Sequence, residues 1–194
     1  DVTVKSGIAG IGHGLSATWW DYNLDNYPDL YVGNDFTDPD RLYRNNQDGT
    51  FTEVLGETMP YCSWSSMGSA SADLNNDGLP DLFSADMAAT SHFKQKVNMG
   101  DMTQHRVLME TGWPRQVMRN MLYVNTGIHQ FKETAFMSGL AQSDWTWAVK
   151  LADFDNDGRS DVYLTNGMAR NFSDSDIPVT PVMLVGRTEF EIYK

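Results

Sequence analysis

Residues 153–161 read Asp-Phe-Asp-Asn-Asp-Gly-Arg-Ser-Asp, and this nine-residue pattern decides how the chain folds. It recurs as Asp-Tyr-Asn-Leu-Asp-Asn-Tyr-Pro-Asp at residues 21–29 and as Asp-Leu-Asn-Asn-Asp-Gly-Leu-Pro-Asp at residues 73–81. Every copy carries an Asp or Asn side chain at positions 1, 3, 5 and 9. A hard cation such as Ca²⁺ takes about six to eight oxygen ligands, which a tight loop supplies when alternate side chains point inward. The pattern therefore predicts three calcium-binding loops.

Each predicted loop offers four side-chain oxygens and, at position 7, a backbone carbonyl. The alternative is that these clusters only make turns, which Asp, Asn and Gly favour. Three copies with oxygens at the same four positions favour metal binding. The predicted side-chain ligands are Asp21, Asn23, Asp25 and Asp29 in the first loop, Asp73, Asn75, Asp77 and Asp81 in the second, and Asp153, Asp155, Asp157 and Asp161 in the third. The predicted carbonyl ligands belong to Tyr27, Leu79 and Arg159.

The first loop is expected to bind calcium most weakly. Position 6 is Asn26 there, whereas it is Gly78 and Gly158 in the other two loops. Asn adopts a left-handed backbone less freely than Gly does. The turn of the first loop is therefore expected to cost more conformational free energy than the turns of the other two loops.

The loops are not EF-hands. An EF-hand needs a bidentate Glu at position 12, whereas that position holds Val32, Ser84 and Leu164 here. The fourth oxygen-bearing side chain stands at position 9 instead. Short runs rich in apolar residues flank each loop, and aromatic and β-branched residues among them are typical of strands. Each loop is therefore predicted to join two strands as the turn of a hairpin.

A second hairpin is predicted after the first and the second loop. Residues 41–53 and residues 120–133 both contain Leu-Tyr-x-Asn, a turn and Phe-x-Glu. A full unit then has four strands, and a period near 50 residues with four strands per unit is typical of a propeller blade. The predicted fold class is all-β: a partial β-propeller of four-stranded antiparallel blades with calcium-binding hairpin loops and one partly helical insertion.

The repeats also predict the boundaries of the blades. Residues 1–9 align with residues 133–141, so the chain is expected to start in the outer strand of an earlier blade. Closed propellers have about four to eight blades, and the chain is therefore expected to be a segment of a longer protein. The predicted propeller segment spans residues 1–172 and comprises the end of a preceding blade (1–10), a blade (11–55), a blade (56–136) with an insertion (87–118) and a partial blade (137–167), before a tail of unknown role (173–194).

The insertion is rich in Met and carries several basic residues. Residues 101–111 have few β-branched side chains and are predicted to form a short helix that ends at Gly112-Trp113-Pro114. A Met-rich segment suits an adaptable binding surface. The alternative, which we favour, is a lid that packs on the rest of the chain.

These repeats resemble FG-GAP/VCBS repeats, the calcium-bearing blades of integrin α-chain heads. The order of several segments narrows the resemblance to bacterial secreted proteins related to cartilage acidic protein, the ASPIC/UnbV type. The resemblance implies a β-propeller, calcium in the hairpin loops and an extracellular setting, and it implies no enzymatic activity. The segments that carry it are 73–78 with Asp86-Met87, 119–122, 143–147 leading into 153–158, and 165–167.

Composition agrees with calcium binding outside the cytosol. The formal charge is −12, and Asp outnumbers Glu 20 to 6, with ten Asp residues in the three loops. Such acidity argues against nucleic-acid binding, and no apolar run reaches the roughly 18 residues of a membrane span. The single cysteine, Cys62, has no partner within the chain. Loops of this kind suit millimolar extracellular calcium, so a secreted, cell-surface or, in bacteria, periplasmic or outer-surface location is expected.

Three functions remain open. The first is a non-catalytic module that binds a protein or glycan ligand in adhesion or surface assembly. The second is a part of a secreted polysaccharide-degrading enzyme, and the third is a structural subunit that contacts neighbouring subunits. Calcium explains every carboxylate cluster with repeated spacing, so the module is favoured and no catalytic residue is predicted. Packing between blades, rather than sugar stacking, is expected of Trp19, Trp20, Trp64, Trp113, Trp145 and Trp147.

Overall fold

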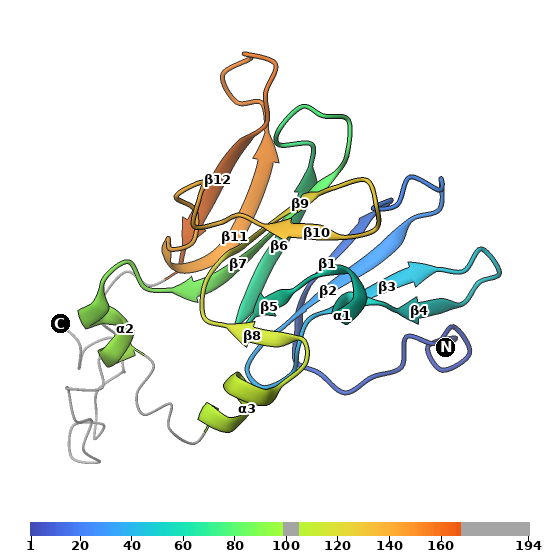
Figure 1. The fold of residues 1–194 in the computed structure, drawn as a ribbon, viewed down its shortest axis with the longest axis horizontal. Coiled ribbons are helices and arrows are strands. Elements are labelled where there is room, and N and C mark those ends of the chain that lie inside the picture. The colour runs from blue at the N-terminus through green and yellow to red at the C-terminus, as the bar shows by residue number, and fades with distance from the viewer. Residues whose placement is uncertain (99–104, 168–194) are drawn as a thin grey trace, which may run out of the picture.

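The computed structural model describes residues 1–98 and 105–167 and is built mainly from antiparallel sheets (Figure 1). Strands pair in sequence order within each repeat, as the predicted hairpins require. The first unit contains β1 (Gly14–Trp20), β2 (Asp29–Asn34), β3 (Arg41–Asn45) and β4 (Phe51–Glu53). The second contains β6 (Ser66–Ala72), β7 (Asp81–Ala88), β9 (Met121–Asn125) and β10 (Phe131–Glu133). The third contains β11 (Asp144–Ala152) and β12 (Asp161–Asn166).

The predicted hairpins around the loops are confirmed with one common register. In each unit the residue before the loop pairs with position 9, as Trp20 does with Asp29. The corresponding pairs are Ala72 with Asp81 and Ala152 with Asp161. All three loops lie along the same edge of the molecule (Figure 1). The second hairpins, β3–β4 and β9–β10, are also confirmed.

Two apolar cores lie between the units, because alternate residues of β7 face opposite sides of the sheet. Leu82 packs with Trp20, Tyr31 and other side chains of the first unit. Its neighbour Phe83 packs with Val149 of the third unit. The middle unit is therefore covered on both faces.

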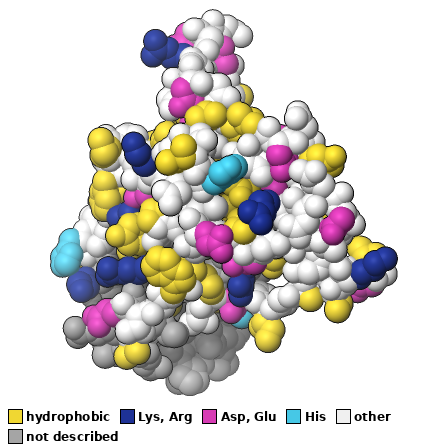
Figure 2. All heavy atoms as spheres, turned by 45° about the vertical axis from the view of Figure 1, so that its right-hand side comes forward, with side chains coloured by type: hydrophobic (Ala, Val, Ile, Leu, Met, Phe, Trp, Pro, Cys, Tyr) yellow, Lys and Arg dark blue, Asp and Glu magenta, His cyan; other side chains and the backbone are white. Residues whose placement is uncertain are grey.

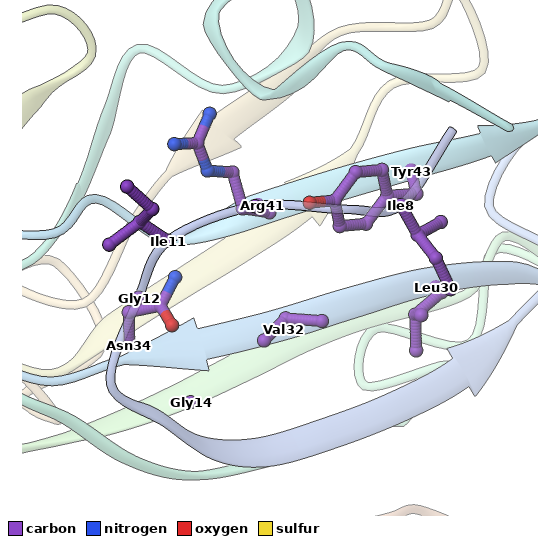
Figure 3. Close-up of a pocket in the computed structure, with 10 residues that line it drawn as sticks. Ile8, Ile11, Gly12, Gly14, Leu30, Val32, Asn34, Arg41 and Tyr43 are labelled. Atoms are coloured by element: carbon purple, nitrogen blue, oxygen red, sulfur yellow. The ribbon is translucent and has the colours of Figure 1, made fainter. Parts of the chain in front are cut away.

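The other face of the first unit is hollowed. A cavity of about 200 Å³ lies between this sheet and the segment that leads into β1 (Figure 3). Its apolar lining comes from Ile8 and Ile11 on the segment and from Leu30, Val32 and Tyr43 on the sheet.

The N-terminal residues form a turn rather than a strand, but the predicted alignment with residues 133–141 holds in the backbone. Three backbone N–H groups donate hydrogen bonds within this turn: Ser6 to the carbonyl of Val2, Gly7 to that of Val4 and Ile8 to that of Thr3. The aligned residues 138–140 make the same three bonds to residues 134–136. Asp1 aligns with Glu133, the last residue of β10, so this turn corresponds to the turn that follows β10.

The insertion contains one short helix in the predicted range, and a second helix and a strand that were not predicted. The helices are α2 (His92–Asn98) and α3 (Arg106–Thr111), and α3 ends just before Gly112 as expected. Strand β8 (Arg115–Val117) pairs in parallel with β5 (Tyr61–Ser63), and a four-residue helix, α1 (Leu55–Thr58), precedes β5. The β8 end of the insertion therefore packs on the sheets. Part of the predicted helix and the tail at 173–194 lie outside the described residues.

Within the described ranges, no helix is long and apolar enough to cross a membrane.

Candidate metal centres

The three Asp-rich loops share one geometry. In the third loop, Asp153 accepts the N–H groups of Asp157 (3.0 Å) and Gly158 (2.9 Å). Asp155 accepts the N–H of Asp157 at 3.1 Å, and Asp157 accepts that of Arg159 at 2.8 Å. The equivalent bonds in the other two loops measure 2.8 to 3.1 Å. The backbone thus turns the same side chains inward in every copy.

The donor set fits a hard cation. Ligand oxygens of Asp153, Asp155 and Asp161 lie within 4.8 Å of one another. A carboxylate oxygen has two lone pairs, so one that accepts a single N–H keeps capacity for a metal. Without a cation these like charges would repel one another at such distances. Calcium bound here would be held by the carboxylates and amide oxygens at positions 1, 3, 5 and 9. The position 7 carbonyls of Tyr27, Leu79 and Arg159 stay a prediction.

Position 9 has a second role that sequence reasoning missed. One oxygen of Asp81 accepts the Leu74 N–H within the loop (3.0 Å), and the other accepts the Asn125 N–H of the second hairpin (2.9 Å). Asn125 also donates its side-chain amide to Pro80. The first unit repeats this arrangement with Asp29, Asn45 and Pro28. The only sequence signal is the Asn that recurs in Leu-Tyr-x-Asn, as Asn45 and Asn125.

We call the bond from position 9 to the second hairpin the clasp. The third loop lacks it within the described residues. Asp29 and Asp81 are fully buried, whereas Asp161 is half-buried and accepts only the Phe154 N–H, at 3.0 Å. Burial raises the pKa of Asp29 to about 6 and raises that of Asp81 above its usual value. A bound cation would oppose this shift because it favours the charged carboxylate.

Backbone strain distinguishes the first loop from the others. Positions 4 and 6 both have positive φ, and position 4 is Leu24 (φ 59°) where the other loops have Asn76 (59°) and Asn156 (61°). A left-handed backbone costs a residue such as Leu about 1–2 kcal/mol, whereas Asn tolerates it better. Leu24 therefore adds to the cost that the sequence assigned to Asn26.

Leu24→Asn is expected to raise the stability of the calcium-saturated protein by about 1 kcal/mol, because it relieves this strain. The thermal midpoint should rise by about 2–4 °C. The matched change Asn156→Leu, at the same position of the third loop, should lower it by a similar amount. Differential scanning calorimetry of both variants tests the prediction, which is wrong if the two changes shift the midpoint in the same direction.

A separate pair of carboxyl groups is buried between the first and second units. Asp40 accepts hydrogen bonds from Tyr31 Oη (2.5 Å), Ser66 Oγ (2.8 Å) and the Asn34 N–H (2.9 Å). Asp86 accepts Ser63 Oγ at 2.5 Å, together with backbone N–H groups of the same turn. Burial raises the pKa of Asp40 to about 7 and that of Asp86 to about 6. The contacts of Asp40 join β2 to β6, and those of Asp86 join β7 to the end of β5 and the turn after it, which gives both carboxyl groups a structural role.

The Asp40 carboxyl should make stability depend on pH. Its folded-state pKa lies above the ordinary value of 3.8, so its contribution is full below about pH 4 and is lost as pH rises through about 7. Between pH 5 and pH 8 the wild type should lose about 3 kcal/mol relative to Asp40→Asn, whose amide does not ionise. Urea unfolding of both proteins in saturating calcium measures the difference. A stability difference independent of pH would contradict the assignment.

Neighbouring loops also touch. The Asn76 side-chain amide of the second loop donates to the Gly158 carbonyl of the third, at 3.3 Å. The candidate centres therefore form a row along one edge rather than isolated turns (Figure 1).

Comparison with known families agrees with the repeat pattern. The family model described as an FG-GAP-like repeat matches residues 21–84 and 113–164. These two ranges contain all three loops and leave out most of the insertion, and they cover more than half of the chain. A search of curated proteins returns no match. The chain belongs to the FG-GAP-like repeat family.

Proposed function

We propose that this chain is a calcium-binding, non-catalytic module of an extracellular or cell-surface protein. The observation that carries the proposal is the shared loop geometry, in which the same inward-facing oxygens are held by the same N–H groups three times. FG-GAP repeats suggest a β-propeller-like module, often in adhesion or extracellular proteins. The module would bind a protein or glycan ligand, or contact neighbouring subunits of a surface assembly.

The finer family assignment is part of this proposal. The antiparallel four-stranded units, with apolar cores on both faces of the middle one, support blades of a propeller. The ordered segments from Asp86-Met87 to Thr165-Asn166-Gly167 support a protein of the ASPIC/UnbV type. Calcium loops with dissociation constants of about 10⁻⁴ to 10⁻³ M would be occupied outside the cell.

The surface supports a ligand other than a nucleic acid. On the face shown in Figure 2, basic side chains are scattered and mixed with acidic ones. Binding of phosphate backbones needs clustered Lys and Arg. The formal charge of −12 adds a general repulsion.

A non-catalytic role is supported by the contacts of the buried carboxyl groups. Both oxygens of Asp40 accept hydrogen bonds from side chains or backbone of adjacent strands. Asp86 accepts three hydrogen bonds through Oδ2, from Ser63 at the end of β5 and from the N–H groups of the next two residues, while its buried Oδ1 has no partner among the described residues. Carboxyl groups held in this way act as structural ties between strands.

Calorimetric titration of chelator-treated protein with calcium tests the proposal. We expect saturable binding at the loops, with the first loop occupied last. A parallel assay for new reducing ends in a polysaccharide panel should show no turnover. Absence of calcium binding would overturn the proposed metal role, and turnover that is lost when residues outside the loops are changed would overturn the non-catalytic role.

A further inference from the structure

A polar groove lies where the insertion meets the first unit, away from the loops. Its volume is about 240 Å³, and it is open on one side. We call it the Trp113 groove. Its lining includes Arg41, Glu53, Gly56, Glu57, Trp113 and Pro114. These residues come from β3, the end of β4, α1 and the turn between α3 and β8.

Trp113 was expected to pack between blades, but 74% of its surface is exposed. Its indole nevertheless has a defined place, because it lies against α1 at Gly56. A Cβ added to Gly56 would come within 2.6 Å of the indole Nε1. The glycine therefore makes room for the ring edge, while most of the indole surface stays open to solvent.

The groove also presents polar groups that have no partner in the described part of the chain. Neither Arg41 nor Glu57 forms a side-chain hydrogen bond or an ion pair there. Arg41, at the start of β3, lines both this groove and the neighbouring cavity beside its cross-strand partner Val32 (Figure 3). Glu53 uses Oε1 for the Leu55 N–H (2.9 Å). Asp40 also lines the groove, but both of its oxygens already accept hydrogen bonds from neighbouring strands. One guanidinium and two carboxylates of the lining are thus available to a ligand.

This combination matches the chemistry of a sugar ring. A pyranose has an apolar C–H face that stacks on an aromatic ring, and hydroxyl groups that both donate and accept hydrogen bonds. Arg41 supplies donors, and Glu57 supplies acceptors. Binding pockets typically combine an apolar surface with a few converging polar groups of this kind.

We propose that the Trp113 groove binds one residue of a neutral polysaccharide, with Trp113 as the stacking platform. An acidic sugar is disfavoured because two carboxylates face the ligand against one guanidinium. A methylated ammonium group is disfavoured because cages for it use several aromatic rings, and Trp113 is the one aromatic residue in this lining. The inference rests on the proposed role as an interaction module and names its ligand class.

Isothermal titration with neutral oligosaccharides of glucose, galactose, mannose and N-acetylglucosamine, in saturating calcium, tests the inference. At least one neutral series should bind. Trp113→Ala should weaken that binding by about tenfold or more, as expected for loss of a central aromatic contact. Gly56→Ala should weaken it without removing the indole, because the added methyl group displaces the ring. Trp19→Ala is the matched control, since Trp19 is 57% exposed but lies in β1, outside the groove.

Three results would overturn the inference: no binding by any neutral series, equal loss in the Trp19 and Trp113 variants, or binding only of a methyl-lysine peptide included as a probe. Calcium titration of the same samples separates the two proposals. Normal calcium binding without saccharide binding would reject the groove assignment alone. Loss of calcium binding would instead reject the proposed metal role.

Discussion

Removal of calcium is expected to lower the thermal midpoint of this protein by at least about 15 °C. A ligand that binds only the folded state adds about 2.7 kcal/mol at a hundredfold excess over its dissociation constant. Three loops with constants near 10⁻⁴ M would together add about 8 kcal/mol at about 10 mM calcium. For a chain of this length, 1 kcal/mol corresponds to about 2–4 °C. Thermal melts before and after treatment with EGTA measure the shift.

Magnesium is the matched control for this experiment. It demands octahedral geometry and gives up its water reluctantly, so it should restore little of the lost stability. Calcium added after the chelator should restore the full midpoint. An unchanged midpoint in EGTA would mean that the Asp-rich loops are only turns.

The loops and hairpins could be predicted from the sequence because their determinants are local. Four oxygen positions within nine residues specify the turn, and short apolar runs on both sides, with aromatic and β-branched residues, specify the strands. The predicted strands around Asp153–Asp161 form β11 and β12 in the expected positions. Repetition made the inference stronger, since a second and a third copy show which positions matter.

Contacts between distant segments could not be predicted in the same way. The bond from the Asn125 N–H to Asp81 joins residues 44 positions apart, and neither residue signals the other. The parallel pairing of β5 with β8 likewise spans the whole insertion. Both depend on how the units pack, which the periodicity of one strand does not encode.

The Trp residues show the same limit. Trp20 and Trp64 are buried, as expected for packing between units, but Trp19, Trp113 and Trp147 are exposed. Hydrophobicity identifies a residue that would gain from burial, but the assembled sheets decide whether a partner surface is present. Trp113 illustrates the point, because its place depends on the absence of a side chain at Gly56 in another element.

Asp81→Ala is expected to destabilise the protein by about 3 kcal/mol even when calcium is absent. The change leaves the buried Asn125 N–H and the Leu74 N–H without their acceptor, and an unsatisfied buried donor costs about 1–3 kcal/mol. Asp161→Ala should cost less than about 1 kcal/mol in EGTA, because Asp161 is half-buried and accepts only one bond. Urea unfolding in EGTA and in calcium measures both.

The two variants together separate the two roles of position 9. In calcium, each variant should also lose the stability that one bound calcium ion contributes. The loss in free energy of unfolding caused by Asp161→Ala should therefore be larger in calcium than in EGTA. The cost of Asp81→Ala should then exceed that of Asp161→Ala by the same margin in both conditions, since only Asp81 clasps a second hairpin. Equal costs in EGTA would show that the clasp contributes nothing. Equal costs with and without calcium for both variants would show that position 9 binds no metal.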